Sequence, residues 1–206
     1  MVNEFVEDIL LPRLNALHSV DRSAGIVRIA TQKTISHTDG VSETFKTFPI
    51  HCGETPEQCF TEGRYKMLVP DDTKENVAFF EQISFTIDST DARNVKATFN
   101  LKFLYWANLA KMGVTSCTPT SSLIFGIMAA LEARAANVGN DGVTVQSTVT
   151  NINTYDYKLA FGRYDFGNTE RFSLYPFGFA AFDIVCVANF NPRCIPAFTV
   201  GTPINC

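Results

Sequence analysis

The chain has 206 residues, of which 46% are apolar and 18% charged, so it has enough apolar side chains for a folded core and is not a disordered chain. Its formal net charge is −4 and its lysines and arginines are scattered, which excludes tight, sequence-independent binding to a nucleic-acid backbone. No apolar run reaches the roughly 18 residues of a membrane span, and the acidic start of the sequence does not resemble an export signal.

The first part of the chain is predicted to be a helix followed by a hairpin. Between residues 2 and 17, apolar side chains recur every three or four positions, which is typical of a helix that covers a core. Pro12 lies inside this pattern and predicts a kink or a break. Residues 26–35 and 43–51 are rich in β-branched and alternating residues on either side of the turn sequence Thr38-Asp39-Gly40, so they are predicted to pair as a hairpin.

The middle of the chain is predicted to contain two neighbouring strands and the longest helix. Residues 77–88 and 95–106 alternate between apolar and polar side chains, as strands with one buried face do. The second strand becomes apolar on both faces from Phe103 onward, so we expect that end to be covered on both sides. Residues 119–138 carry one apolar stripe and are predicted to form a long helix that ends at Gly139.

The last part of the chain is predicted to be rich in strands, which we place near residues 143–150, 157–164 and 177–190. The last of these is almost wholly apolar and is expected to be central in the sheet. The order of elements predicts an α+β fold, a mostly antiparallel sheet with an N-terminal helix and one long helix packed on it, plus an extended hairpin arm. We expect a single domain over residues 1–206, with residues 36–75 as the projecting arm and residues 190–206 as a docking tail.

The sequence contains no motif that is typical of an active site. The spacing of its six cysteines differs from the short paired spacing of zinc sites, and without an export signal we expect free thiols. A thiol enzyme would need a cysteine and a histidine that the fold brings together, such as Cys117 and His37, and this stays a minor hypothesis. The acidic stretches at Asp71-Asp72 and residues 88–91 are interpreted as solvated turns, because neither has the pattern of a calcium loop. We therefore expect no enzyme activity, no cofactor and no metal.

One part of the sequence resembles a known family. Residues 83–88 form an alternating strand, and residues 98–109 form a second one that ends in Tyr105-Trp106-Ala107-Asn108-Leu109. This ending is similar to a motif in small neck or tail-ring proteins of crAss-like and related Bacteroidetes phages. A helix and an aromatic C-terminal strand near Tyr175-Pro176-Phe177 follow in the same order, so the resemblance covers roughly residues 80–190.

The resemblance implies a tail-terminator-like fold and a structural function in the virion. Such subunits form a homo-oligomeric, about twelve-fold ring below the portal and extend the channel through which DNA leaves the capsid. The implied location is the neck or tail of the virion, after assembly in the host cytoplasm. The implied partners are copies of the same chain, the portal and other neck or tail proteins. DNA would pass through the lumen without sequence-specific contacts, and no membrane is involved.

Ring subunits meet head to tail, so each subunit needs two different adhesive surfaces. We expect the arm and its surroundings to supply aromatic anchors, and the predicted interface residues are Phe45, Phe48, Phe60, Tyr65, Phe79 and Phe80. The alternative interpretation is a virion or surface binding module that recognises a carbohydrate or a receptor. In that case the groove would be lined by aromatic residues between 155 and 175, namely Tyr155, Tyr157, Tyr164 and Tyr175 with Phe161, Phe166 and Phe172.

Overall fold

The computed structural model of the chain describes residues 1–17, 20, 23–36, 42–51, 68–90, 94–115, 119–138, 143–166 and 174–190. These residues form an α+β fold built on a seven-stranded sheet with the strand order β2-β1-β3-β4-β7-β6-β5. The strands are β1 (Ser23–Ser36), β2 (Ser42–His51), β3 (Asn76–Thr90), β4 (Val95–Asn108), β5 (Ala133–Val138), β6 (Val143–Asn153) and β7 (Phe177–Phe190). The helical segments are α1 (Val2–Glu4), η1 (Phe5–Leu10), α2 (Leu11–Asn15), α4 (Ser121–Leu131) and α5 (Tyr157–Phe161).

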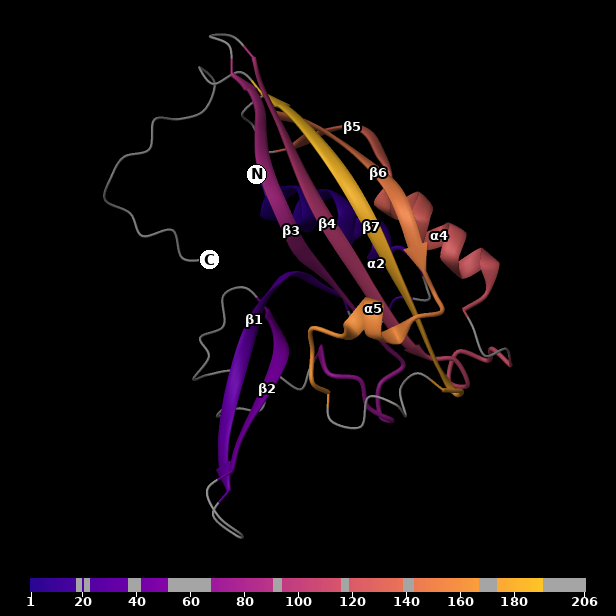
Figure 1. Cartoon of the computed structure of the whole chain (residues 1–206). Helices are drawn as coiled ribbons and strands as arrows, with labels where there is room; N and C mark the ends of the chain where they lie inside the picture. The colour runs from indigo at the N-terminus through magenta and orange to yellow at the C-terminus, as the bar shows by residue number, and fades with distance from the viewer. Residues whose placement is uncertain are drawn as a thin grey trace.

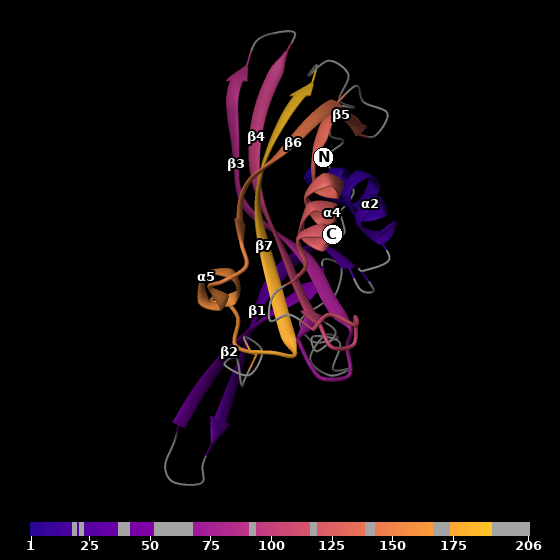
Figure 2. The ribbon, with the colours of Figure 1, turned by 90° about the vertical axis from the view of Figure 1, so that its right-hand side faces the viewer.

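Helices lie on both faces of the sheet (Figures 1 and 2). The N-terminal helical segments and α4 cover one face, which we call the helix face, and α5 lies on the opposite face. The core under the helix face includes Phe5 and Leu14 from the N-terminal segments and Phe103 from β4. A second core on the α5 face includes Trp106 and Phe161. The C-terminal half of β4, from Phe103 onward, is therefore covered on both sides, as its apolar sequence predicts.

The prediction of an N-terminal helix is confirmed. The segments α1, η1 and α2 follow one another without a break, and the apolar side chains of Phe5, Leu10 and Leu14 are fully buried. Pro12 lies in the first turn of α2, and the preceding segment η1 is π-helical, with the N–H of Leu11 donating to the carbonyl of Val6. A wider π turn relieves the clash between the proline ring and the preceding turn, so the helix continues past the proline.

The two alternating central strands are confirmed as β3 and β4. They pair antiparallel along their length, with register shifts between Gln82 and Ser84 and between Ile87 and Ser89. Each shift is a β-bulge, which bends the strand and increases its twist. The strand predicted for residues 177–190 is β7, which lies between β4 and β6 and is buried along most of its length.

The sheet is mixed, which corrects the prediction of a mostly antiparallel sheet. β1 runs parallel to β3, pairing at Ser23↔Ala78 and Ile26↔Phe80, whereas the other described strand pairs are antiparallel. The reason is the hairpin, because β2 pairs on the outer side of β1 and returns the chain toward the end at which β1 began. β3 then starts from the same end as β1 and runs in the same direction.

The long helix predicted for residues 119–138 is wrong. α4 ends at Leu131, Glu132 has an extended backbone with φ −86° and ψ 128°, and Ala133–Val138 forms β5. The alanines favour a helix, but pairing with β6 and burial of both ends of β5 override that preference. The carbonyl of Glu132 accepts a 2.6 Å hydrogen bond from Nη1 of Arg13, which holds the point where the helix ends. No helix among the described residues is long and apolar enough to cross a membrane.

The strand predicted for residues 157–164 is also wrong, because this segment contains the helix α5. Asp156 precedes the helix, and its Oδ1 accepts a 3.0 Å hydrogen bond from the N–H of Leu159, which is an N-cap. The aromatic residues that suggest a strand instead anchor this short helix: Tyr157 and Phe161 are buried against β7.

Candidate functional site

The predicted hairpin is confirmed as the pair β1–β2. Beyond Ile26, β1 leaves β3 and pairs with β2 alone among the described strands. This ladder runs from Val27↔His51 to Ser36↔Ser42 without a register shift. The result is a two-stranded ribbon that extends beyond the body of the molecule (Figures 1 and 2).

The base of the hairpin is anchored to the body. Ala30 and Phe48 lie opposite each other in the ladder and are 7% and 6% exposed. The N–H of Asp165, in the segment after α5, donates a 2.8 Å hydrogen bond to the carbonyl of Thr47. Phe48 is a predicted interface residue, and in the isolated chain its side chain is packed in the core on the α5 face.

One edge of β3 has no partner strand among the described residues along Glu81–Thr90. β1 reaches this edge only at its start, and the last pair is Ile26↔Phe80. Backbone N–H and C=O groups on such an edge form a template for another strand. In both views this end of β3 and the ends of β1 and β2 that are farthest from the body lie at opposite ends of the molecule (Figures 1 and 2).

An apolar strip accompanies the open edge. It consists of Ile83, Phe85 and Ile87, which we call the β3 strip, and these side chains are 52%, 43% and 55% exposed. Phe85 pairs with Phe99, which is fully buried in the helix-face core, and Ile87 pairs with Ala97, which is also fully buried. The strip therefore continues the helix-face core outward to the edge of the sheet. Three neighbouring, half-exposed apolar side chains of this kind form a candidate contact surface.

The other predicted interface residues have different surroundings. Phe79 and Phe80 are 1% and 0% exposed, so they fill the two cores and are not available to a neighbouring subunit. Phe45 is 57% exposed on the hairpin. Phe60 and Tyr65 lie outside the described residues, as does the tail beyond residue 190.

Of the predicted arm, residues 36–75, the structure describes residues 36, 42–51 and 68–75. Residues 52–67 lie outside the described residues, and residues 68–75 belong to the body. Leu68 is buried in the core on the α5 face, and Lys74 is 5% exposed. The projecting part that the structure describes is therefore the β1–β2 hairpin itself.

The aromatic residues of the alternative, sugar-binding interpretation are divided between surface and core. Tyr155 is 83% exposed and Tyr175 is 49% exposed. Tyr157 is buried and stacks on Phe161 with a centroid distance of 5.0 Å, and Tyr164 is buried as well. An open depression of about 520 Å³ lies around α5. Two of these four tyrosines thus belong to the core, and Phe172 lies outside the described residues.

A buried ion cluster links β3 to the segment after α5. Glu81 is 3% exposed, its Oε1 accepts a 2.5 Å hydrogen bond from the hydroxyl of Tyr164, and its Oε2 lies 3.0 Å from Nη1 of Arg163. Burial, followed by the negative charge of Glu81, raises the pKa of Tyr164 above its ordinary range, so the hydroxyl stays protonated and donates. Both carboxylate oxygens are satisfied, which gives the cluster a structural function.

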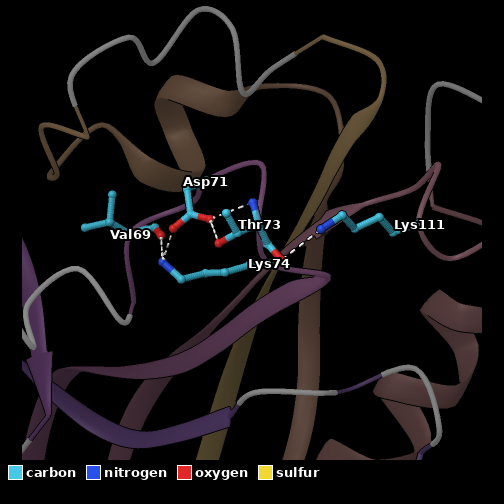
Figure 3. A network of polar contacts seen from close by, with 5 residues as sticks. All are labelled: Val69, Asp71, Thr73, Lys74 and Lys111. Carbon is cyan, nitrogen blue, oxygen red and sulfur yellow. Dashed lines mark hydrogen bonds and ion pairs between the residues drawn. The ribbon is translucent and has the colours of Figure 1, made fainter.

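A second polar network holds the loop before β3 (Figure 3). Oδ1 of Asp71 accepts hydrogen bonds of 2.8 Å and 2.5 Å from the N–H and hydroxyl of Thr73, and its Oδ2 lies 2.7 Å from Nζ of Lys74. Nζ of Lys74 also donates to the carbonyl of Val69, and Nζ of Lys111 donates to the carbonyl of Thr73 at 2.8 Å. The network joins this loop to the turn after β4 and is interpreted as structural.

Asp71→Asn is expected to lower stability at neutral pH by about 1 kcal/mol, because solvent screens this half-exposed ion pair. Burial alone would raise the pKa of Asp71, but hydrogen bonds from Lys74 and Thr73 and the charge of Lys74 lower it from 3.8 to about 2. The folded-state pKa is depressed, so the stabilisation is present above pH 4 and is lost as pH falls through about 2. Urea denaturation at several pH values should show the difference in stability between Asp71→Asn and the unmodified chain shrinking in that window.

The remaining described candidates for chemistry are few. Cys186 is buried in β7, and burial raises the pKa of its thiol to about 12, so it is a poor nucleophile at neutral pH. Cys117 and His37 lie outside the described residues. In the described part of the chain, no group of three or more His, Cys, Asp or Glu side chains could hold a metal ion.

Comparison of the sequence with known protein families and with curated proteins gives no match, so function has to be inferred from the chain's own residues.

Proposed function

We propose that this chain is a structural subunit that assembles head to tail with copies of itself. The observation that carries the proposal is the β1–β2 hairpin, which leaves the sheet after Ile26 and extends beyond the body as a two-stranded ribbon. A head-to-tail assembly needs two different adhesive surfaces on each subunit, and a projecting ribbon is suited to be one of them.

On the resemblance of residues 80–190 we further propose that the assembly is a ring in the neck or tail of a phage. In this arrangement the ring stacks below the portal or another neck protein, and its channel lets DNA leave the capsid. The net charge of −4 supports such a channel, because a mildly acidic protein does not hold the phosphate backbone of DNA. The subunit functions by associating with its neighbours in the ring. The two hydrophobic cores, one on each face of the sheet, stabilise its fold.

Quantitative mass spectrometry of purified particles from the source tests this proposal. We expect the copy number of the chain relative to the portal protein to be one or a small whole multiple, because stacked rings have related symmetry. Absence of the chain from the particle would contradict a neck or tail function.

A shortened hairpin tests the observation that carries the proposal. Residues 33–45 are replaced by Asn-Gly, which joins the paired residues Gln32 and Lys46 through a two-residue turn and keeps the buried base. We expect an unchanged urea midpoint and loss of self-association, because the ribbon no longer reaches a neighbour. The matched control replaces only the turn sequence 38–40 by Asn-Gly and should assemble as the unmodified chain does. Normal assembly of the shortened chain would show that the hairpin is not adhesive.

A further inference from the structure

We propose that the β3 strip and the open edge of β3 form the second adhesive surface, and that it receives the β1–β2 hairpin of a second copy of the chain. This inference rests on the proposed function and names the partner surface of the hairpin. The incoming ribbon continues the sheet of its neighbour by adding strands next to β3, a mode of recognition in which backbone hydrogen bonds supply much of the affinity.

The receiving surface offers both backbone and side-chain contacts. Strand addition satisfies the outward N–H and C=O groups along Glu81–Thr90, which no described strand pairs. The same event covers Ile83, Phe85 and Ile87, each about half exposed in the isolated chain. Phe99 lies beneath this surface and is held by an edge contact with Phe5, with 6.0 Å between ring centroids, so the strip rests on a packed core.

The donated ribbon gains from a third strand. A two-stranded hairpin without further packing is marginally stable in water, and this one leaves its own sheet after Ile26. The outer edge of β2 is contacted at Thr47 by the N–H of Asp165, so the edge available for docking is that of β1 beyond Ile26. The ribbon can therefore remain attached to its own body while its β1 edge pairs with a neighbour.

The ribbon also carries apolar anchors on one face. The ladder places Lys33 opposite Phe45 and Ile29 opposite Pro49, and residues separated by four positions along a strand share a face. Ile29 and Phe45 are thus on the same face and are 43% and 57% exposed. When the hairpin adds to the sheet of a neighbour, Ile29 and Phe45 become buried against the β3 strip of that neighbour.

Three properties make a second copy of this chain the occupant. The open stretch Glu81–Thr90 equals in length the β1 segment Val27–Ser36, about 33 Å at 3.3 Å per residue. The two hairpin strands contain three lysine or arginine residues and one acidic residue. The exposed charge of the open β3 stretch is the carboxylate of Asp88, because Glu81 is buried and paired with Arg163. The two surfaces lie at opposite ends of the molecule, so the contact is head to tail (Figures 1 and 2).

Single lysine substitutions in the full chain test the receiving surface. Phe85→Lys and Ile87→Lys should each weaken self-association at least about tenfold in sedimentation velocity, because a charge is placed in the apolar contact. Their urea midpoints should stay close to that of the unmodified chain, because both side chains are already exposed by 43% and 55%. Phe125→Lys is the matched control, since Phe125 is 60% exposed on α4 outside the strip, and it should associate normally.

A mixing experiment tests whether the contact joins two different surfaces. A hairpin-defective chain with Ile29→Lys and Phe45→Lys keeps its strip, and a strip-defective chain with Phe85→Lys keeps its hairpin. Each should be monomeric alone, and their mixture should form a one-to-one complex that grows no further, because the pair has a single intact contact. A complex of this kind in native mass spectrometry supports the proposal.

The outcomes separate the inference from the proposed function. If the unmodified chain assembles and the strip variants assemble equally well, the inference fails while the ring function stands. Strip variants that keep assembling but lose stability as monomers would show that the strip is covered within its own chain, and would also overturn the inference. If the unmodified chain stays monomeric up to about 100 µM, the proposed self-docking surface is contradicted. The count of copies per particle then tests the ring function separately.

Discussion

The Phe103→Ala variant is expected to lose about 3–5 kcal/mol of its free energy of unfolding. Phe103 is fully buried in β4, and its ring centroid lies 4.8 Å from that of Phe80 on β3 and 6.0 Å from that of Phe182 on β7. Removing the ring interrupts an aromatic row across three neighbouring strands and leaves a cavity that the sheet cannot close. Total stabilities of domains are about 5–15 kcal/mol, so this loss should lower the urea midpoint strongly at an unchanged m-value.

Phe125→Ala is the matched control for this prediction. It removes the same side chain from a helix surface where Phe125 is 60% exposed, so we expect a change within about 0.5 kcal/mol. If both alanine variants unfold at the same urea concentration, the aromatic row is not the centre of the helix-face core.

Tyr164→Phe is expected to cost about 1.5–3 kcal/mol, although it removes a single hydroxyl group. That hydroxyl donates to Oε1 of Glu81 at 2.5 Å, and Glu81 is 3% exposed, so the carboxylate has no water to replace the lost donor. The ring stays in place against Phe166, with stacked planes and a centroid distance of 5.4 Å. Addition of Arg163→Gln should raise the total loss to about 3–5 kcal/mol, because the buried charge then loses its ion pair too.

A double-mutant cycle distinguishes this effect from lost packing. In the Tyr164→Phe background, Glu81→Leu should recover part of the lost stability, because the stranded carboxylate is removed together with its donor. The same Glu81→Leu change alone should be destabilising. Additive effects of the two substitutions would mean that the short hydrogen bond contributes no coupling energy.

The alternating strands were predictable from sequence because their burial is one-sided and local. Residues 77–88 and 95–106 are predicted to be neighbouring strands, and they form β3 and β4, which pair antiparallel. The hairpin was predictable for a similar reason, since a turn sequence lies between two β-branched segments. In these elements, the side-chain pattern and the turn chemistry agree with the final fold.

The errors occurred where tertiary contacts decide the local structure. The alanine-rich residues 132–138 favour a helix, yet most of them form the edge strand β5 because β6 offers it a partner. Residues 157–164 are aromatic, yet they begin with the helix α5, and Asp156 was an available N-cap signal. The parallel pairing of β1 and β3 depends on the side of β1 on which β2 adds, which no local pattern specifies.

The candidate site was predicted only in part. The sequence pattern predicted the hairpin that carries the exposed Phe45, but Phe79 and Phe80, which are predicted interface residues, lie in the core. It also identified the common side of Ile83, Phe85 and Ile87 without recognising their exposure. Exposure depends on where the helices stop and on which edge lacks a partner, and both are properties of the assembled fold.

The pairing of β4 with β7 has a mechanical consequence. From Val95↔Phe190 to Asn108↔Phe177 the ladder has no register shift, whereas β3 and β6 on either side each contain bulges. A pull along these two strands loads their backbone hydrogen bonds in shear, so many must break together rather than one by one. The bulged strands β3 and β6 can bend at a lower force, so the β4–β7 pair is the stiffest part of the sheet. Pulling the chain from its two ends in a single-molecule force experiment should therefore show the rupture of this pair as the highest force peak.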